Sequence, residues 1–414
     1  MPETYVAVLS VLVYAALLYG LLRYKRWWRI LAWPEHPTLR VMWVLWLGFL
    51  LVVTPLTYHE RDMMNWVDGI NSQLQGTLLP EGYVYLPIYA QLHAALLYPI
   101  HLFGLDKFTI VVVLIHLLII TAYAFAAGWM VELSPKDKQL APLATVLAPT
   151  TIFFIFFGTN HVVMWALLAA ALVLLTQEKY ALAGFAAFAG GYKLLLLPVS
   201  ATLLVFVFNR KGRKKALSYL TGGLVFLLLN VPYYLFDKER LRLLWTARGS
   251  TGSYATHLDA FHLFHLIGAR APSFETWFLE KHIWLYVIGL ISLVAVVLYV
   301  LKRINTLQGL AFVYAAVALL APEPLRLEPL LGLLWLDSIA REDRISQGSV
   351  VLVALVYAAF WFQQAYPQIL TLAPYSGIVL HAPARGLYVG GAVLLAVIVS
   401  LGSKKRGEFL LLET

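Results

Sequence analysis

Residues 57–102 read TYHERDMMNWVDGINSQLQGTLLPEGYVYLPIYAQLHAALLYPIHL and connect two long apolar runs, 41–57 and 86–104. Within this stretch, residues 62–75 repeat their apolar positions with the period of an amphipathic α-helix. The apolar side would carry Met63, Trp66, Val67, Ile70 and Leu74, and the polar side Asp62, Asn65, Gly69, Ser72 and Gln73. We expect such a helix to lie along a bilayer surface and to hold Asp62 on its water-facing side.

The composition predicts an integral membrane protein. The chain is 61% hydrophobic and 13% charged, and its mean hydropathy is +0.76. Soluble globular proteins contain more charged and fewer hydrophobic residues than this, so that class is excluded. Apolar runs of spanning length, counting short and proline-broken ones, occur about thirteen times. They cover residues 5–23, 41–57, 86–104, 109–131, 142–157, 160–176, 180–208, 215–236, 283–301, 309–321, 328–340, 348–364 and 386–402. The sequence therefore predicts an all-α, polytopic fold. The first run is expected to remain as a helix, because it lacks a small-residue cleavage site.

The basic residues indicate how these runs are oriented. If successive loops alternate between the two faces, the main basic loops share one face, which the positive-inside rule makes cytoplasmic. These loops contain Lys25, Arg26 and Arg29; Lys107; Arg210, Lys211, Arg213, Lys214 and Lys215; Lys302 and Arg303; Arg341 and Arg344; and Lys404, Lys405 and Arg406. They explain most of the net charge of +9 through attraction to anionic lipid, so the charge does not imply nucleic-acid binding.

The opposite face would receive the polar segment 58–85 and the loops 132–141, 237–282, 321–328 and 365–385. Loop 237–282 is basic although the rule disfavours positive charge on that face, and an anionic ligand is one reason for such a cluster. Its basic residues include Lys238, Arg240, Arg242 and Arg248. The chain has no cysteine, which excludes disulfides, thiol nucleophiles and cysteine-bound metals.

Three groups of residues follow one another in a recognisable order. They are Asp62, Gly76 and Tyr83-Val84-Tyr85-Leu86-Pro87; Pro149 with Gly158-Thr159-Asn160; and Ala183-Gly184 with Gly190-Gly191-Tyr192-Lys193 and Pro198. In this order they resemble the GT-C glycosyltransferases, and most closely the branch that uses polyprenyl-phosphate-mannose, which includes the phosphatidylinositol-mannoside and GPI mannosyltransferases. The resemblance covers residues 41–235 and depends on order and topology more than on any single motif. The chain departs from the family in the span 5–23, in Leu86 and in Asn160.

The resemblance also implies how the chain is divided. Residues 1–40 would form an additional N-terminal helix and a basic inner loop, and residues 41–236 the core module with the catalytic outer loop 58–85. A second functional outer loop, 237–282, and the C-terminal helices, 283–414, would follow. We expect the protein in the plasma membrane of a prokaryote, with its site on the extracytoplasmic face.

In the reaction that the resemblance implies, an acceptor hydroxyl attacks the anomeric carbon of a hexose on a polyprenyl phosphate, and the phosphate departs with inversion. The hexose is expected to be mannose, and the acceptor a lipid-linked molecule or a glycan. A carboxylate must take the hydroxyl proton, and the resemblance assigns this role to Asp62. A plain carboxylate at a helix start is the alternative interpretation, because free backbone amides favour it there.

The departing phosphate needs cations or hydrogen-bond donors. We expect these to be Lys193 in run 180–208 and Arg248, His257 and His262 in loop 237–282. Lys193 could instead reach the membrane surface with its long side chain. The histidines could lie on the wet side of an amphipathic surface helix, or ligate a metal; neither a metal nor a cofactor is expected.

The remaining predicted substrate contacts are Asp68, Tyr83, Tyr85, Arg326 and Glu328. Asp68 could equally be solvated, and Arg326 and Glu328 could pair with each other. A polytopic transporter or lipid flippase is the alternative function. A transporter is expected to contain an internal repeat, and the sequence has none that we find. Asp62 and the basic outer loop favour catalysis instead.

Overall fold

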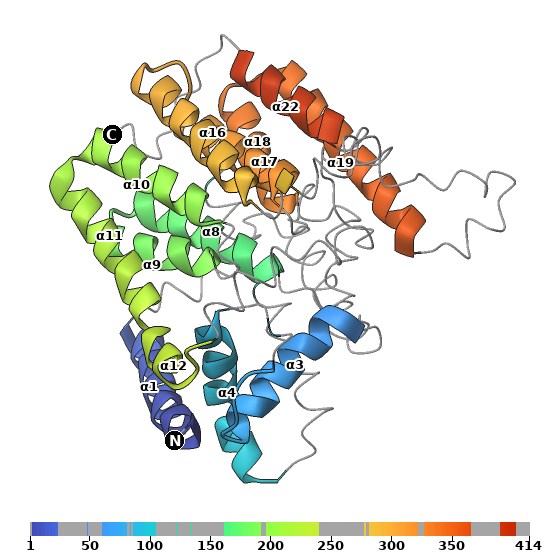
Figure 1. Ribbon diagram of the computed structural model, residues 1–414. Helices are drawn as coiled ribbons and strands as arrows, with labels where there is room; N and C mark the ends of the chain where they lie inside the picture. Colours follow the sequence, from blue (N-terminus) through green and yellow to red (C-terminus); the bar gives the residue numbers. More distant parts are fainter. Residues whose placement is uncertain are drawn as a thin grey trace, which may run out of the picture.

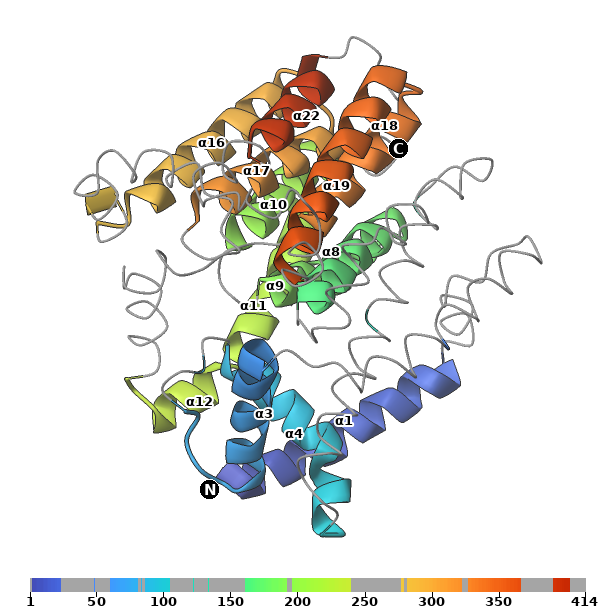
Figure 2. The same cartoon turned by 90° about the vertical axis from the view of Figure 1, so that its right-hand side faces the viewer.

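The computed structural model describes residues 2–23, 48, 60–80, 83, 86–104, 122, 133, 161–191, 196–239, 277–278, 281–321, 327–365 and 390–402. Within these residues every regular element is helical, as the sequence predicts (Figures 1 and 2). The helices are α1 Pro2–Arg23, α3 Glu60–Leu74, α4 Pro87–Leu102, α8 His161–Thr176, α9 Tyr180–Gly190, α10 Leu197–Lys211, α11 Arg213–Leu228, α12 Val231–Phe236, α16 Ile283–Val300, α17 Thr306–Leu320, α18 Glu328–Ala340, α19 Arg344–Ala365 and α22 Gly391–Gly402.

The helices form two groups. In both views α1, α3, α4 and α12 lie together at one end, while α8 to α11, α16 to α19 and α22 make up the rest (Figures 1 and 2). Helix α4 packs against α1 and α3. It also reaches the larger group, because the ring of Tyr89 lies 6.1 Å from that of Phe226 on α11. Asn230, between α11 and α12, accepts a hydrogen bond from the Ile88 amide at 3.1 Å. Helix α4 therefore links the two groups.

Glycines allow α9 and α11 to cross with their backbones in contact. A Cβ on Gly184 would lie 1.8 Å from the carbonyl oxygen of Tyr219, and a Cβ on Gly222 would lie 1.8 Å from that of Ala181. No side chain fits at either position, since contacts between a Cβ and another heavy atom do not come so close. The two helices can therefore cross this closely only because both positions are glycine.

The predicted single span 180–208 is wrong: the structure has two helices there, α9 and α10. Helix α9 ends at Gly190, and α10 begins at Leu197 with Pro198 in its first turn. Glycine disfavours the helical interior, and proline is accepted only where its missing N–H would be unbonded anyway. The paired glycines and the proline therefore divide residues 180–208 into two helices, although the apolar content of this run predicts one.

Helices α9 and α10 form a hairpin. Glu178, just before α9, pairs with Lys215 in the first turn of α11 at 3.2 Å, so α9 and α11 start at the same end. Only Gly212 separates the last residue of α10, Lys211, from α11. The start of α9 and the end of α10 therefore lie at one end of the molecule, whereas a single crossing would separate them.

Several basic turns meet at this end, which we call the basic end: residues 177–179, 210–215, 301–304 and 341–344. Hydrogen bonds join these turns and the end of α22 to one another. They run from Arg210 Nε to Tyr299 Oη at 3.2 Å, from Asn305 Nδ2 to Asp337 Oδ1 at 2.6 Å, and from Gln308 Nε2 to the Ser400 carbonyl oxygen at 2.6 Å. Loops 210–215, 302–303 and 341–344 therefore lie at one end of the molecule, and their placement on one membrane face stays a prediction. The basic residues at 25–29, 107 and 404–406 lie outside the described residues.

The segment after α3 lies at the other end of α11. The Leu79 amide donates to Tyr233 Oη of α12 at 2.7 Å, and α12 follows the last turn of α11. In both views α11 runs from α10 to α12, which lies in the group that contains α1, α3 and α4 (Figures 1 and 2). The polar segment that contains α3 is therefore opposite the basic end, which agrees with the predicted placement of residues 58–85.

Two described helical stretches are long and apolar enough to cross a membrane. They are Arg213–Phe236, with a mean hydropathy of 1.5, and Ile283–Val300, with 2.6. The other described apolar helices are shorter than this or less apolar. The predicted runs 41–57, 109–131 and 142–157 lie almost wholly outside the described residues.

Candidate functional site

Helix α3 buries the apolar face that its sequence predicts. Trp66, Val67, Ile70 and Leu74 are at most 3% exposed, because α3 packs against α4. The helix covers Glu60–Leu74, close to the predicted 62–75. Asp68 is exposed on the opposite side. The amphipathic pattern is thus realised by helix packing.

Two residues predicted on the polar face are buried instead: Gly69 and Gln73. The ring of Tyr83 lies on Gly69, so close that a Cβ there would be 2.3 Å from Cε2 of the ring. Gln73 Nε2 donates to the carbonyl oxygen of Thr77 at 3.1 Å. The chain after α3 therefore covers one edge of the expected polar face, which a helical period cannot reveal.

This correction changes the expected position of the candidate base. Asp62 precedes Trp66 by four residues, so the helix register puts it one turn away on the same face. Asp68 follows Trp66 by two residues, about 200° round the helix. The register of α3 thus separates the two aspartates, with position 62 towards the packed side. The side chain of Asp62 lies outside the described residues, and its role stays a prediction.

Beneath α3, helix α4 presents a buried histidine. The rings of Trp66 and His93 are 4.7 Å apart and nearly perpendicular, at 70°. His93 is 9% exposed, and its Nδ1 lies 2.6 Å from the carbonyl oxygen of Tyr89. Gln91, on the same helix, is 3% exposed. The sequence analysis missed both, although polar residues within an apolar run are a signal of function.

Helix α4 continues the contacts to the end of α9. Tyr89 Oη donates a hydrogen bond to the carbonyl oxygen of Ala189, four residues before Lys193. Trp66, His93, Tyr89 and Ala189 therefore form a connected series, which we call the α3–α4–α9 junction. It joins the helix that carries Asp62 to the link that carries Lys193.

The other predicted site residues are placed only in part. Tyr83 is 2% exposed, packed on α3. Glu328 begins α18, but its side chain lies outside the described residues. Lys193, Arg248, His257, His262, Tyr85 and Arg326 also lie outside them. Among the residues that are described, no group of three His, Asp or Glu could hold a metal ion.

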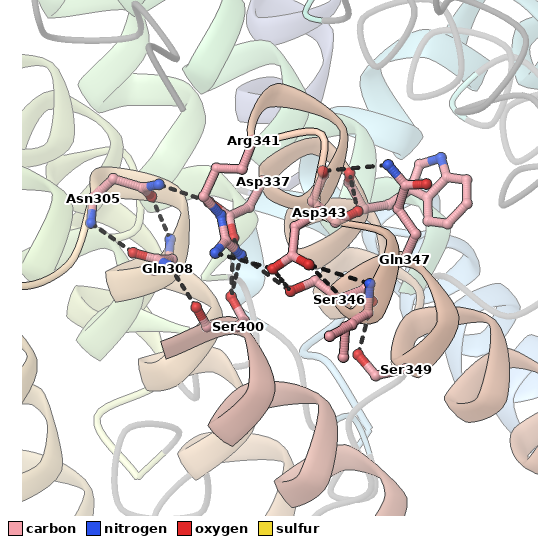
Figure 3. A network of polar contacts seen from close by, with 12 residues as sticks. Asn305, Gln308, Asp337, Arg341, Asp343, Ser346, Gln347, Ser349 and Ser400 are labelled. Carbon is pink, nitrogen blue, oxygen red and sulfur yellow. Dashed lines mark hydrogen bonds and ion pairs between the residues drawn. The ribbon is translucent and has the colours of Figure 1, made fainter. Parts of the chain in front are cut away.

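A second polar cluster lies at the basic end, which we call the basic-end network: Asn305, Gln308, Asp337, Arg341, Asp343, Ser346 and Ser400 (Figure 3). At its centre Arg341 Nη2 pairs with Asp337 Oδ2, and both side chains are at most 1% exposed. Asp337 also accepts from Asn305 at 2.6 Å and from Ser400 at 2.9 Å. The network therefore ties α17, α18 and α22 together.

The network continues into α19 through two residues. Asp343 accepts from the Ser346 hydroxyl at 2.8 Å and from the Ile345 amide at 3.2 Å, so it caps the start of that helix. Its carboxylate is 3.7 Å from Arg341 Nη1. The sequence analysis counted Arg341 as a loop cation and passed over Asp337. Their spacing of four residues at the end of an apolar run was the available signal.

No family model matches the sequence, and no curated protein matches it.

Proposed function

We propose that this chain is an integral membrane glycosyltransferase of GT-C type. It transfers a hexose, with mannose expected, from a polyprenyl phosphate to a lipid-linked or glycan acceptor. The acceptor hydroxyl attacks the anomeric carbon, the bond to the phosphate breaks on the opposite side, and the configuration inverts. Asp62 takes the hydroxyl proton.

The α3–α4–α9 junction is the observation that carries this proposal. The reaction needs a carboxylate on one side of the anomeric carbon and positive charge on the other. The junction connects the helix of Asp62 with the end of α9, four residues before Lys193. A base and a phosphate-binding cation are thus expected in one region, although 131 positions separate them in the sequence, 193 minus 62. Arg248, His257 and His262 are proposed as additional phosphate ligands.

A membrane location is supported by the outer surfaces of the helices. On α16, Tyr286, Leu290 and Leu293 are 74%, 61% and 58% exposed, and they follow one another at helical spacing. Apolar stripes of this kind are disfavoured in water and are covered by lipid in a bilayer. The positive-inside rule then puts the basic end in the cytoplasm and α3 on the extracytoplasmic face. A prokaryotic plasma membrane is the expected location.

The experiment is a transfer assay with purified protein, radiolabelled polyprenyl-phosphate-mannose and a lipid extract as acceptor. Asp62→Asn should fold and bind donor but lose turnover by a factor of about 100 or more, the usual effect of removing a positioned base. Asp68→Asn is the matched control and should lose much less, because Asp68 lies on the exposed side of α3. Near-normal turnover of Asp62→Asn would remove Asp62 from the mechanism.

The α9–α10 hairpin favours one alternative, because short broken helices are also typical of transporters. A transporter or flippase would move the polyprenyl-phosphate sugar across a vesicle bilayer without forming a glycoside. Transbilayer movement of the donor with no transferred sugar, in vesicles that contain a competent acceptor, would favour that function over ours.

A further inference from the structure

The hydrogen bond of His93 determines which ring nitrogen carries the proton. Its Nδ1 lies 2.6 Å from the carbonyl oxygen of Tyr89. A carbonyl oxygen can only accept, so Nδ1 must donate. In the neutral ring the other nitrogen, Nε2, then keeps its lone pair and is an acceptor. The protonation is inferred from this partner.

Nε2 has no hydrogen-bond donor among the described residues around it. The side chain is 9% exposed and lies against Trp66, which is 2% exposed. The lone pair of Nε2 can therefore accept a hydrogen bond from a ligand that donates one.

The acceptor character of Nε2 restricts the chemistry of that ligand. A phosphate oxygen of the donor lipid is itself an acceptor and cannot satisfy a lone pair. A sugar hydroxyl is a donor of the right kind. The position also fits, because Asp62 lies one helical turn before Trp66, whose ring His93 contacts.

We propose that Nε2 of His93 accepts a hydrogen bond from a sugar hydroxyl, on the transferred hexose or on a glycan acceptor. This inference rests on the proposed function and names a binding residue that the family resemblance does not. His93 would hold the sugar in register with Asp62 and would take no proton during the reaction. Tyr89, through its carbonyl oxygen, would act as a positioning residue that selects the tautomer.

Three substitutions separate this role from packing. His93→Phe keeps an aromatic ring against Trp66 and removes both nitrogens. His93→Gln can place an amide oxygen near the position of Nε2, whereas His93→Asn reaches only as far as Nδ1. Gln91→Leu is the control, because Gln91 is a buried polar residue of the same helix about 200° away from His93.

We expect His93→Phe to lower kcat/KM by about ten-fold, as for the loss of one hydrogen bond. His93→Gln should recover most of this loss, while His93→Asn should not. A higher KM for donor alone places the hydroxyl on the transferred hexose, and a higher KM for acceptor alone places it on the glycan. Gln91→Leu should leave both KM values unchanged.

Deoxy-sugar substrates provide the decisive measurement. For the wild-type protein, one deoxy analogue should be a poorer substrate than the parent sugar. For His93→Phe that analogue and the parent sugar should be equally good, because the partner of the missing hydroxyl is already gone. Equal penalties in both proteins at every hydroxyl, or unchanged KM values in a folded His93→Phe, would overturn the inference.

A thermal-shift titration with polyprenyl-phosphate-mannose, and with a free glycan acceptor, tests binding without turnover. Weaker binding of either ligand by His93→Phe supports the inference even if the wild-type protein transfers no sugar, in which case only the proposed reaction fails. Wild-type protein that binds neither ligand would overturn both.

Discussion

The α3–α4–α9 junction and the basic-end network both bury polar side chains between helices, but they differ in how far their hydrogen-bond acceptors are paired. In the network, one carboxylate, that of Asp337, accepts from Asn305, Arg341 and Ser400. In the junction, Nε2 of His93 has no hydrogen-bond donor among the described residues. The comparison indicates that the network holds helices together, whereas the junction leaves one acceptor, Nε2 of His93, for the proposed sugar hydroxyl.

The largest expected effect concerns the two ends of the molecule, the basic end that contains the network and the opposite end that contains α3. The chain lacks cysteine, so a single introduced thiol is the only one present. Glu178→Cys and Lys214→Cys should react with an impermeant reagent from the same side of the membrane, because α9 and α10 form a hairpin. Lys238→Cys should react from the opposite side. Labelling is measured in sealed right-side-out and inverted vesicles.

The same experiment distinguishes the hairpin from the single crossing predicted for residues 180–208. A single crossing would put positions 178 and 214 on opposite sides. That outcome would also separate the basic turns that form one end in the structure.

The next effect concerns the network itself. Arg341→Met should destabilise the protein by about 3–5 kcal/mol, because the buried carboxylate of Asp337 loses its charged partner. The double variant Asp337→Leu with Arg341→Met should recover part of this loss, since no charge remains unpaired. Unfolding is followed by circular dichroism during heating and detergent titration. Arg344→Met, which alters an exposed arginine nearby, is the control and should unfold like the wild-type protein.

A smaller effect is expected where the junction meets the chain after α3. Gly69→Ala should cost about 1–3 kcal/mol, because the new methyl group overlaps the ring of Tyr83 and the packed region must shift. Tyr83→Leu should relieve the overlap, so the two substitutions together should cost less than the sum of each alone. Additive losses would mean that Tyr83 does not press on α3.

The smallest effect is expected for an ion pair that is not buried. Lys215→Met removes the contact with Glu178, whose side chain is 61% exposed. Exposed pairs are screened by water and salt and contribute little. No measurable change in the unfolding midpoint is expected. A loss comparable with that of Arg341→Met would show that burial is not what distinguishes the network.

Sequence periodicity predicted the elements of this fold better than their connections. The amphipathic helix at 62–75 and its buried Trp66 face follow from local spacing, and so they are found where expected. The burial of Gly69 depends on Tyr83, fourteen residues further on, and no local period contains that contact. The single span 180–208 was wrong because hydropathy averages over the glycines and the proline that break it.

The candidate site was predicted in part for a similar reason. Asp62 follows from the resemblance and from its place beside an apolar run. His93 and Gln91 carried a signal as polar residues within an apolar run, but their burial depends on the packing of α4 against α3 and the rest of the fold. Asp337 and Arg341 carried a local signal in their spacing, but their burial depends on α17, α19 and α22.

The glycine crossing of α9 and α11 has an evolutionary consequence. Every missense change at Gly184 or Gly222 adds at least one carbon atom, and each would overlap a backbone carbonyl oxygen at 1.8 Å. Selection should therefore retain glycine at both positions for as long as this crossing exists, while the exposed apolar residues around them drift among apolar types. Distant descendants of the same ancestor should be recognisable by these two glycines and their separation after overall sequence similarity has disappeared.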